Sequence, residues 1–223
     1  MSGMDFNRAR KQVRDLIKEF QGRRASTNTE IRKLQQGKLY ELYVLGWLLR
    51  ELRRRGFDIS LNGSVLSLKQ APGKIKPGDT YFEVRHARSR KRFRVYTDIQ
   101  VRTLGSSIVP TTDLCGHHEI DIVVVDEDAT GMPSHKQLAL GVECKSNVDF
   151  RKTILKEVLG IRREIALLTD KRRSILAKVS RECEPKIPAL PASEYLVCYL
   201  DRAGDRYAHS PKAFGIEFEY LRP

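Results

Sequence analysis

Apolar positions along the chain recur with two different periods, and each change of period predicts a change of secondary structure. A period near 3.6 residues predicts amphipathic helices at 4–20, about 27–55, 150–169 and, for a short one, near 171–182. Alternating or continuous apolar runs predict strands at 57–61, 64–69, 81–87, 92–101, 118–127, 136–145, 194–200 and 213–221. Helices and strands mixed in this way indicate an α/β fold.

The boundaries of the second helix carry their own signals. Thr27 followed by Glu30 has the spacing of an N-terminal capping box. Gly56 is a plausible C-terminal stop, and the arginines before it suit the negative end of a helix. Gly37 is a candidate interruption. The sequence therefore predicts a helix that ends at about Arg55.

The chain is predicted to form one main domain. Residues 1–26 are interpreted as an N-terminal amphipathic helix and linker, and residues 27–223 as a single domain. The Pro-rich stretch "EPKIPALPAS", 184–193, is expected to be a connector. The apolar face predicted for the N-terminal helix consists of Phe6, Val13, Ile17 and Phe20.

The stretch "LALGVECKSN", 138–147, is an apolar run that ends in two charges separated by one cysteine. Alternate side chains of a strand share a face, so Glu143 and Lys145 are expected to project together. Cys144 is expected on the opposite face, pointing into a core. The residues predicted to share that core face are Leu138, Leu140, Val142 and Cys144.

The preceding strand supplies a partner for Glu143. If the strands at 118–127 and 136–145 form an antiparallel hairpin with its turn centred near Met132, Asp121 lies opposite Glu143. Two adjacent carboxylates repel each other unless one is protonated or a cation intervenes. Mg²⁺ or Mn²⁺ is the natural resolution, because a hard divalent cation prefers carboxylate and carbonyl oxygens.

A fourth charged residue, Glu41, lies on an apolar stripe of the second helix, with Leu45, Leu48 and Leu52. A carboxylate on such a stripe needs a cation nearby, and the cluster around Asp121 is the obvious candidate. Each charge also has a plainer interpretation. Glu41 could pair with Lys38, Asp121 could cap a turn, and Glu143 with Lys145 could be a surface pair.

Net charge and composition limit the classes of molecule that the chain is expected to bind. The 223 residues carry a formal net charge of +13, which favours polyanions and above all nucleic acid. No apolar stretch approaches the ~20 residues that a membrane span requires. The four cysteines lack CxxC pairing and are interpreted as reduced, in a cytoplasmic protein. "CGHH" at 115–118 lacks a second cluster at zinc-ligand spacing.

Two basic segments are candidates for phosphate contacts, with a solvated surface as the alternative for each. The first, "RHARSRKRFR" at 85–94, is expected to form a hairpin or loop that grips the nucleic-acid backbone. The second is on the helix after "ECKS". His118 could act near a metal or a phosphate, or be structural. The residues assigned to nucleic-acid binding are Arg88, Arg90, Lys91, Arg92, Lys152 and Lys156.

Glu41 on a helix, "EID" ending at Asp121, "ECK" at 143–145 and a following helix together resemble the PD-(D/E)xK nuclease superfamily. The resemblance covers roughly residues 38–168. It implies a restriction-endonuclease-like core, with a central mixed β-sheet flanked by α-helices in the order α-β-β-β-α-β. Two departures are Ile120 in place of the motif's proline, and a long segment near 57–118, interpreted as an inserted basic β-rich region.

The resemblance also implies roles for the site residues. Asp121, Glu143 and the backbone carbonyl of Cys144 would hold Mg²⁺ or Mn²⁺, Lys145 would orient or activate the attacking water, and Glu41 would support a second metal or the water network. The expected function is a metal-dependent DNA endonuclease, in restriction or antiphage defence. Alternatives are an RNA or branched-DNA nuclease and a non-catalytic nucleic-acid-binding subunit. A homodimer and a subunit of a larger defence complex both stay open.

Overall fold

The computed structural model describes residues 5–21, 34–63, 66, 68–69, 71–108, 114–146, 149–180 and 185–223. It is an α/β structure built on a mixed seven-stranded sheet in the order β1-β2-β3-β4-β5-β8-β9. The strands are β1 (Phe57–Asn62), β2 (Tyr81–His86), β3 (Arg92–Arg102), β4 (His117–Asp126), β5 (Leu138–Lys145), β8 (Glu194–Tyr199) and β9 (Ile216–Tyr220).

Neighbouring strands from β1 to β5 are antiparallel, whereas β5, β8 and β9 are parallel. The predicted central mixed sheet flanked by helices is therefore confirmed. The segment near 57–118, expected as an insertion, contributes β1, β2 and β3 to this sheet. In the described residues, five strands of this sheet lie between the second helix and the helix after "ECKS", more than the implied α-β-β-β-α-β order contains.

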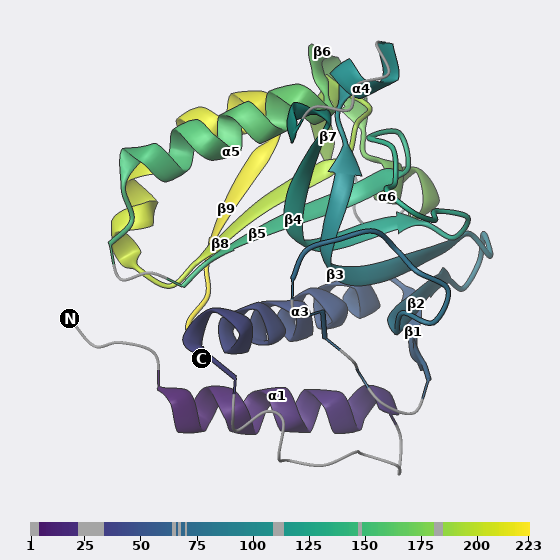
Figure 1. Ribbon diagram of the computed structural model, residues 1–223, viewed down its shortest axis with the longest axis vertical. Coiled ribbons are helices and arrows are strands. Elements are labelled where there is room, and N and C mark those ends of the chain that lie inside the picture. Colours follow the sequence, from purple (N-terminus) through teal and green to yellow (C-terminus); the bar gives the residue numbers. More distant parts are fainter. Residues whose placement is uncertain are drawn as a thin grey trace.

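Helices cover both faces of the sheet (Figure 1). Helix α3 (Gln36–Arg54) lies against one face, with α1 (Phe6–Gln21) packed on its outer side, and α5 (Lys152–Ile165) lies over the other face. Each face has its own buried cluster of apolar side chains, one shared with α1 and α3 and one with α5. The shorter helical segments are α4 (Leu104–Ile108), η1 (Leu114–Gly116), α6 (Ile175–Val179), η2 (Arg202–Tyr207) and η3 (Ser210–Phe214).

The second helix ends where the sequence predicts. Arg55 is its C-cap, and Gly56 follows with φ of 84°, a left-handed conformation that glycine adopts without steric cost. Gly37 lies in the first turn and does not interrupt the helix. The capping box at Thr27 and Glu30 lies outside the described residues.

The first helix buries most of its predicted apolar face. Val13 and Phe20 are buried and Ile17 packs against the same core. Including Phe6 was wrong, because its side chain is exposed, whereas Ala9 is fully buried. The buried face therefore begins at Ala9, about one turn into the helix.

Three predicted elements after residue 150 differ from the structure. The helix expected at 150–169 ends at Ile165, and β6 (Leu167–Arg173) takes the place of its last turn. The short helix expected at 171–182 is limited to α6. The expected connector contains β7 (Lys186–Leu190), which pairs with β6 in a separate two-stranded sheet. Leu168 fits the helical period that predicted the longer helix, but its side chain is exposed on the β6–β7 ribbon. Of the strand expected at 64–69, the described residues are not in a strand.

Candidate active site

The candidate site is formed where β4 and β5 stop pairing. Ile122 pairs with Val142 and Val124 with Leu140, a register centred on Met132, as the sequence predicts. This register places Asp121 opposite Glu143. Here Asp121 Oδ2 accepts a hydrogen bond from the Cys144 backbone N–H at 2.6 Å. The Asp121 side chain thereby ties the two strands together at the point where their ladder ends.

The face of β5 that carries the charges is buried against α5 and β8. Glu143 is only 4% exposed, and the Tyr195 hydroxyl donates to its Oε1 at 3.3 Å. Lys145 Nζ lies 3.1 Å from Glu143 Oε2 and 3.0 Å from Oε1 of Glu157 on α5. Lys145 is therefore held between two carboxylates, one buried and one exposed.

The opposite face of β5 follows the prediction with one exception. Leu140 and Val142 belong to the core shared with α3, and Cys144 packs against it. Leu138 belongs instead to the core shared with α5. The pairing partner changes from Leu140 at Val124 to Leu138 at Val125, so β5 has one extra residue at this point. An extra residue reverses the faces of the strand beyond it, which explains the difference.

Helix α3 brings the predicted Glu41 to this region together with its neighbour Lys38. Lys38 Nζ lies 2.6 Å from Glu41 Oε2 and also contacts Asp98 Oδ1. The lysine pairing that the sequence offers for Glu41 is thus present, and it links the helix to β3. Leu45, Leu48 and Leu52 are buried on the same stripe, as predicted.

Asp98 is a member of the cluster that sequence reasoning missed. The β3–β4 ladder pairs Thr97 with Ile122 and Ile99 with Ile120, which leaves Asp98 facing Asp121. Asp98 is 4% exposed with φ of 56°, and its Oδ2 has no hydrogen-bond partner among the described residues. Such a strained backbone is typical of functional sites. The signal was an acid inside an apolar strand, the same signal that identified Asp121.

Burial and mutual repulsion raise the pKa values of the carboxyl groups in this cluster. Burial, with the charges of Asp121 and Asp98, raises the pKa of Glu41 to about 7, although Lys38 opposes the change. Burial also raises the pKa of Asp121 and that of Glu143, and the Asp121 charge adds to the effect at Glu143. Burial disfavours the Lys145 ammonium, but Glu143 and Glu157 outweigh it and raise the pKa of Lys145.

This donor set fits a divalent cation. Carboxylates outnumber ammonium groups five to two, one buried carboxylate oxygen is unpartnered, and oxygen ligands of this kind suit Mg²⁺ or Mn²⁺. Within the described ranges no three His, Cys, Asp or Glu side chains already have the mutual spacing of a metal site. Glu41 and Glu143 each contact a lysine instead. The carboxylates are Glu41, Asp98, Asp121, Glu143 and Glu157.

We expect the repulsion to appear as a pH-dependent stability of the metal-free protein. A carboxyl group whose pKa is raised by folding favours the folded state when protonated, so the contribution of Glu41 is complete below pH 4.5 and lost as the pH approaches 7. In EDTA, Glu41→Gln should therefore melt a few degrees above the wild type at pH 8 but not at pH 4.5. Thermal melts at both values, with the exposed Glu119→Gln as control, test this. An equal difference in Tm between Glu41→Gln and the wild type at both pH values would contradict a raised pKa of Glu41.

The other predicted residues lie outside the cluster. His118 Nε2 contacts Glu164 Oε2 on α5 at 2.8 Å, which supports a structural role. Lys152 and Lys156 are exposed on α5. The basic segment forms the turn between β2 and β3, where Arg88, Arg90, Lys91 and Arg92 are exposed. Lys91 is also paired with Asp126.

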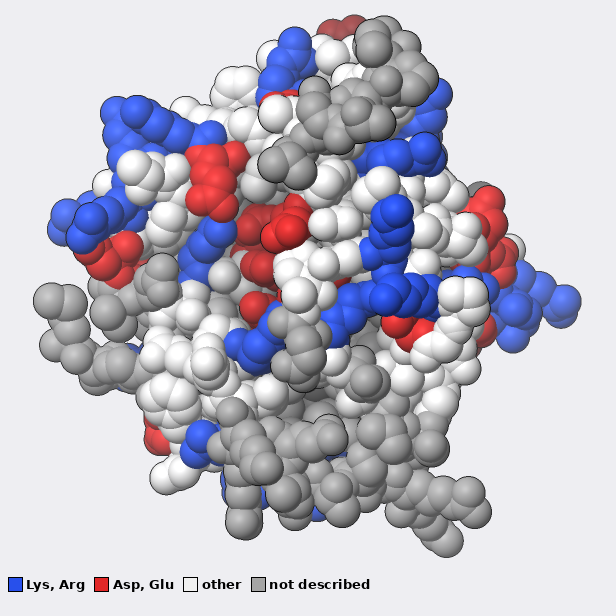
Figure 2. Space-filling view, viewed as in Figure 1, with Lys and Arg blue, Asp and Glu red and all other residues white. Residues whose placement is uncertain are grey.

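One face of the molecule combines both kinds of charge. Figure 2 shows acidic atoms gathered near the centre of the face seen in Figure 1, between α5 and α3, with lysine and arginine side chains around them. On this face, basic side chains therefore surround the acidic cluster.

Comparison with protein-family models, curated proteins and solved structures gives no match for this chain. In the part of the chain that the structure describes, no helix is long and apolar enough to cross a membrane.

Proposed function

We propose that this protein is a metal-dependent endonuclease that hydrolyses phosphodiester bonds in DNA, with a restriction-endonuclease-like active site. The observation that carries the proposal is the convergence of Asp121, Glu143 and Lys145 at the end of the β4–β5 ladder, with Glu41 supplied by α3. The excess of buried carboxylates supports a cation there, and the basic surface supports a polyanionic substrate.

Different residues of the site are assigned to holding the cation and to positioning the water and the phosphate. Asp121, Glu143 and the Cys144 carbonyl would hold the cation, and Asp98 is a further candidate ligand through its unpartnered oxygen. When bound, Mg²⁺ lowers the pKa of water and stabilises charge on phosphorus. Lys145, an ammonium held by Glu143 and Glu157, positions the attacking water and donates to a nonbridging phosphate oxygen. Glu41 orders the surrounding water.

The exposed basic residues supply substrate affinity. Arg88, Arg90 and Arg92 project from the β2–β3 turn, and Lys152 and Lys156 lie one turn apart on α5. Contacts of this kind go to phosphates and carry no sequence information. The proposed enzyme therefore binds the DNA backbone at the rim and cuts at the acidic centre.

Divalent cations are expected to stabilise the folded protein. Binding to the folded state alone adds about 2.7 kcal/mol at a hundredfold excess over Kd, which corresponds to roughly 5–10 °C in Tm for a chain of this size. Mg²⁺ or Ca²⁺ should raise Tm at pH 7.5, and Asp121→Asn should remove most of the shift. Asparagine can still accept the Cys144 hydrogen bond, so the strand junction is preserved.

The salt contribution must be separated from specific binding. Potassium chloride at matched ionic strength is the control, because a chain of net charge +13 also responds to anions. A shift of the same size in Asp121→Asn, or none in the wild type, would remove the cation from the proposal.

A further inference from the structure

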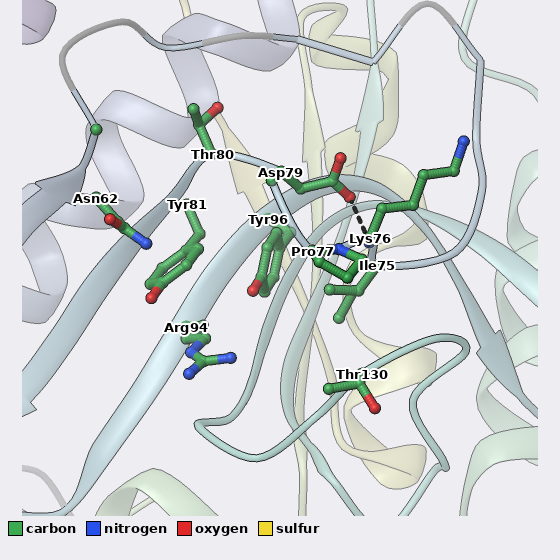
Figure 3. Close-up of a pocket in the computed structure, with 12 residues that line it drawn as sticks. Asn62, Ile75, Lys76, Pro77, Asp79, Thr80, Tyr81, Arg94, Tyr96 and Thr130 are labelled. Carbon is green, nitrogen blue, oxygen red and sulfur yellow. Dashed lines mark hydrogen bonds between the residues drawn. The ribbon is translucent and has the colours of Figure 1, made fainter.

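A concave site lies near the acidic cluster, on the outer part of the sheet. It is a pocket of about 490 Å³, within the ~300–1,000 Å³ range of small-ligand sites. Figure 3 shows Tyr81 from β2 and Tyr96 from β3 projecting into it, with Arg94 beside them and Thr130 on the facing loop. Asn62, at the end of β1, adds an amide to the rim.

The aromatic and cationic groups of this pocket form one cluster, in which the two tyrosine rings are tilted by 47° to each other. The ring centroids of Tyr81 and Tyr96 are 5.3 Å apart, and the Arg94 guanidinium carbon lies 4.9 Å from the Tyr81 centroid. Tyr96 is 4% exposed, so it forms the floor, whereas Tyr81 and Arg94 remain partly accessible. The Arg94 guanidinium lies over the Tyr81 ring, and both groups are accessible enough for a planar ligand to stack against them.

Backbone hydrogen bonds hold the pocket wall in place. Ile75 and Gly131 exchange hydrogen bonds at 2.7 and 3.1 Å, which fixes the wall to the β4–β5 loop. Gly73 donates to the Asp98 carbonyl at 3.0 Å, which fixes the same wall to β3. The Asp79 carboxylate accepts from Lys76 N and Lys69 Nζ and closes the turn at the rim. The pocket is thus preformed, which lowers the entropic cost of binding.

We propose that this pocket binds an unstacked nucleobase of the substrate strand, an inference that rests on the proposed nuclease function. Proteins hold unpaired bases by stacking them on aromatic and arginine side chains and by hydrogen bonds to their edges. Tyr81 and Arg94 offer the stacking surface, and the Asn62 amide offers a donor and an acceptor for a base edge.

The pocket and the acidic cluster are neighbours along β3. Tyr96 and Asp98 are two residues apart on β3, about 7 Å at the rise of a strand. A smaller hollow of about 190 Å³ shares Tyr96 with the pocket and extends to Thr97, directly before Asp98. A nucleotide whose base occupies the pocket would therefore place its phosphate beside the acids, which makes a single-stranded or locally unpaired segment the preferred substrate.

The test compares ligands that share a phosphate backbone and differ in bases. Binding of oligo(dT) and of an abasic oligomer of equal length would be measured with the full-length Asp121→Asn protein in Ca²⁺. We expect oligo(dT) to bind about tenfold more tightly, and Tyr81→Ala in the same background to abolish that preference without weakening abasic binding. Tyr81→Leu, which keeps the apolar bulk, should behave like Tyr81→Ala and controls for folding.

A matched control is present elsewhere in the chain. The Arg202 guanidinium of η2 lies 4.6 Å from the ring centroid of Tyr220 on β9, a similar pair outside the pocket, so Tyr220→Ala should leave the preference intact. Equal affinity of the unaltered pocket for both oligomers would overturn the base pocket while leaving backbone binding in place. An unchanged preference in both Tyr81 variants would also overturn it. Failure to bind either oligomer would overturn the proposed function as well.

Discussion

Replacing Asp121 with asparagine is expected to lower Mg²⁺-dependent cleavage by at least about 1,000-fold, because a metal ion supplies several kcal/mol of charge stabilisation that the variant cannot retain. The change removes one charge and preserves the acceptor for the Cys144 N–H. It also relieves repulsion with Asp98 and Glu143, so the variant should be at least as stable as the wild type. Initial rates at saturating DNA, together with melts in EDTA, measure both effects.

The matched control is Asp126→Asn, the same substitution at the last residue of β4. Asp126 contacts Lys91 and is not part of the acidic cluster. Its turnover should stay close to that of the wild type. Loss of activity in Asp126→Asn as large as in Asp121→Asn would indicate that activity depends on the integrity of the strand rather than on the Asp121 carboxylate.

Substituting Lys145 with methionine is expected to reduce turnover by about 100- to 1,000-fold, the usual effect of removing one donor from a developing negative charge. Methionine keeps the length of the side chain but cannot form an ion pair with Glu143 or Glu157. Substrate binding in Ca²⁺ should change little, because Lys145 acts on the reacting phosphate rather than on the rim. Single-turnover rates and Kd values, measured separately, distinguish the two.

Lys152→Met serves as the comparison for that variant. Lys152 is exposed at the start of α5, where a phosphate contact would affect Kd and leave saturated turnover largely unchanged. If Lys145→Met behaved in the same way, with weaker binding and normal turnover, Lys145 would be a backbone contact and its assigned role would be wrong.

The sequence predicted the β4–β5 hairpin and its register because both depend on local patterns. Continuous apolar runs mark buried strands, and the loop between them centres the pairing on Met132. The end of α3 was also predictable, because Gly56 is needed for a left-handed residue. Asp121, Glu143 and Lys145 followed from these elements.

The sequence marks Asp98 only as an acid inside a strand, and it reveals neither the contact of Asp98 with the cluster nor the β6–β7 ribbon. Asp98 joins the cluster through a positive φ that no pattern of apolar residues encodes. Glu157 reaches Lys145 only because α5 crosses the end of β5. Strand β6 is mostly exposed and polar and lacks the alternation that predicts a sheet, whereas β7 alternates but lies in a Pro-rich stretch. These features depend on tertiary contacts between segments far apart in the chain.

The most direct test of the nuclease proposal is cleavage of covalently closed circular DNA, both single- and double-stranded, by the full-length protein and Asp121→Asn side by side. Closed circles have no ends, so only an endonuclease can linearise them. The proposal predicts linear product from the wild type in Mg²⁺ or Mn²⁺, none in EDTA, and almost none from Asp121→Asn in any of these. Cleavage that persists in EDTA, or proceeds equally in the variant, would contradict a metal-dependent site at Asp121. Intact circles of both kinds with every metal would contradict the DNA endonuclease itself.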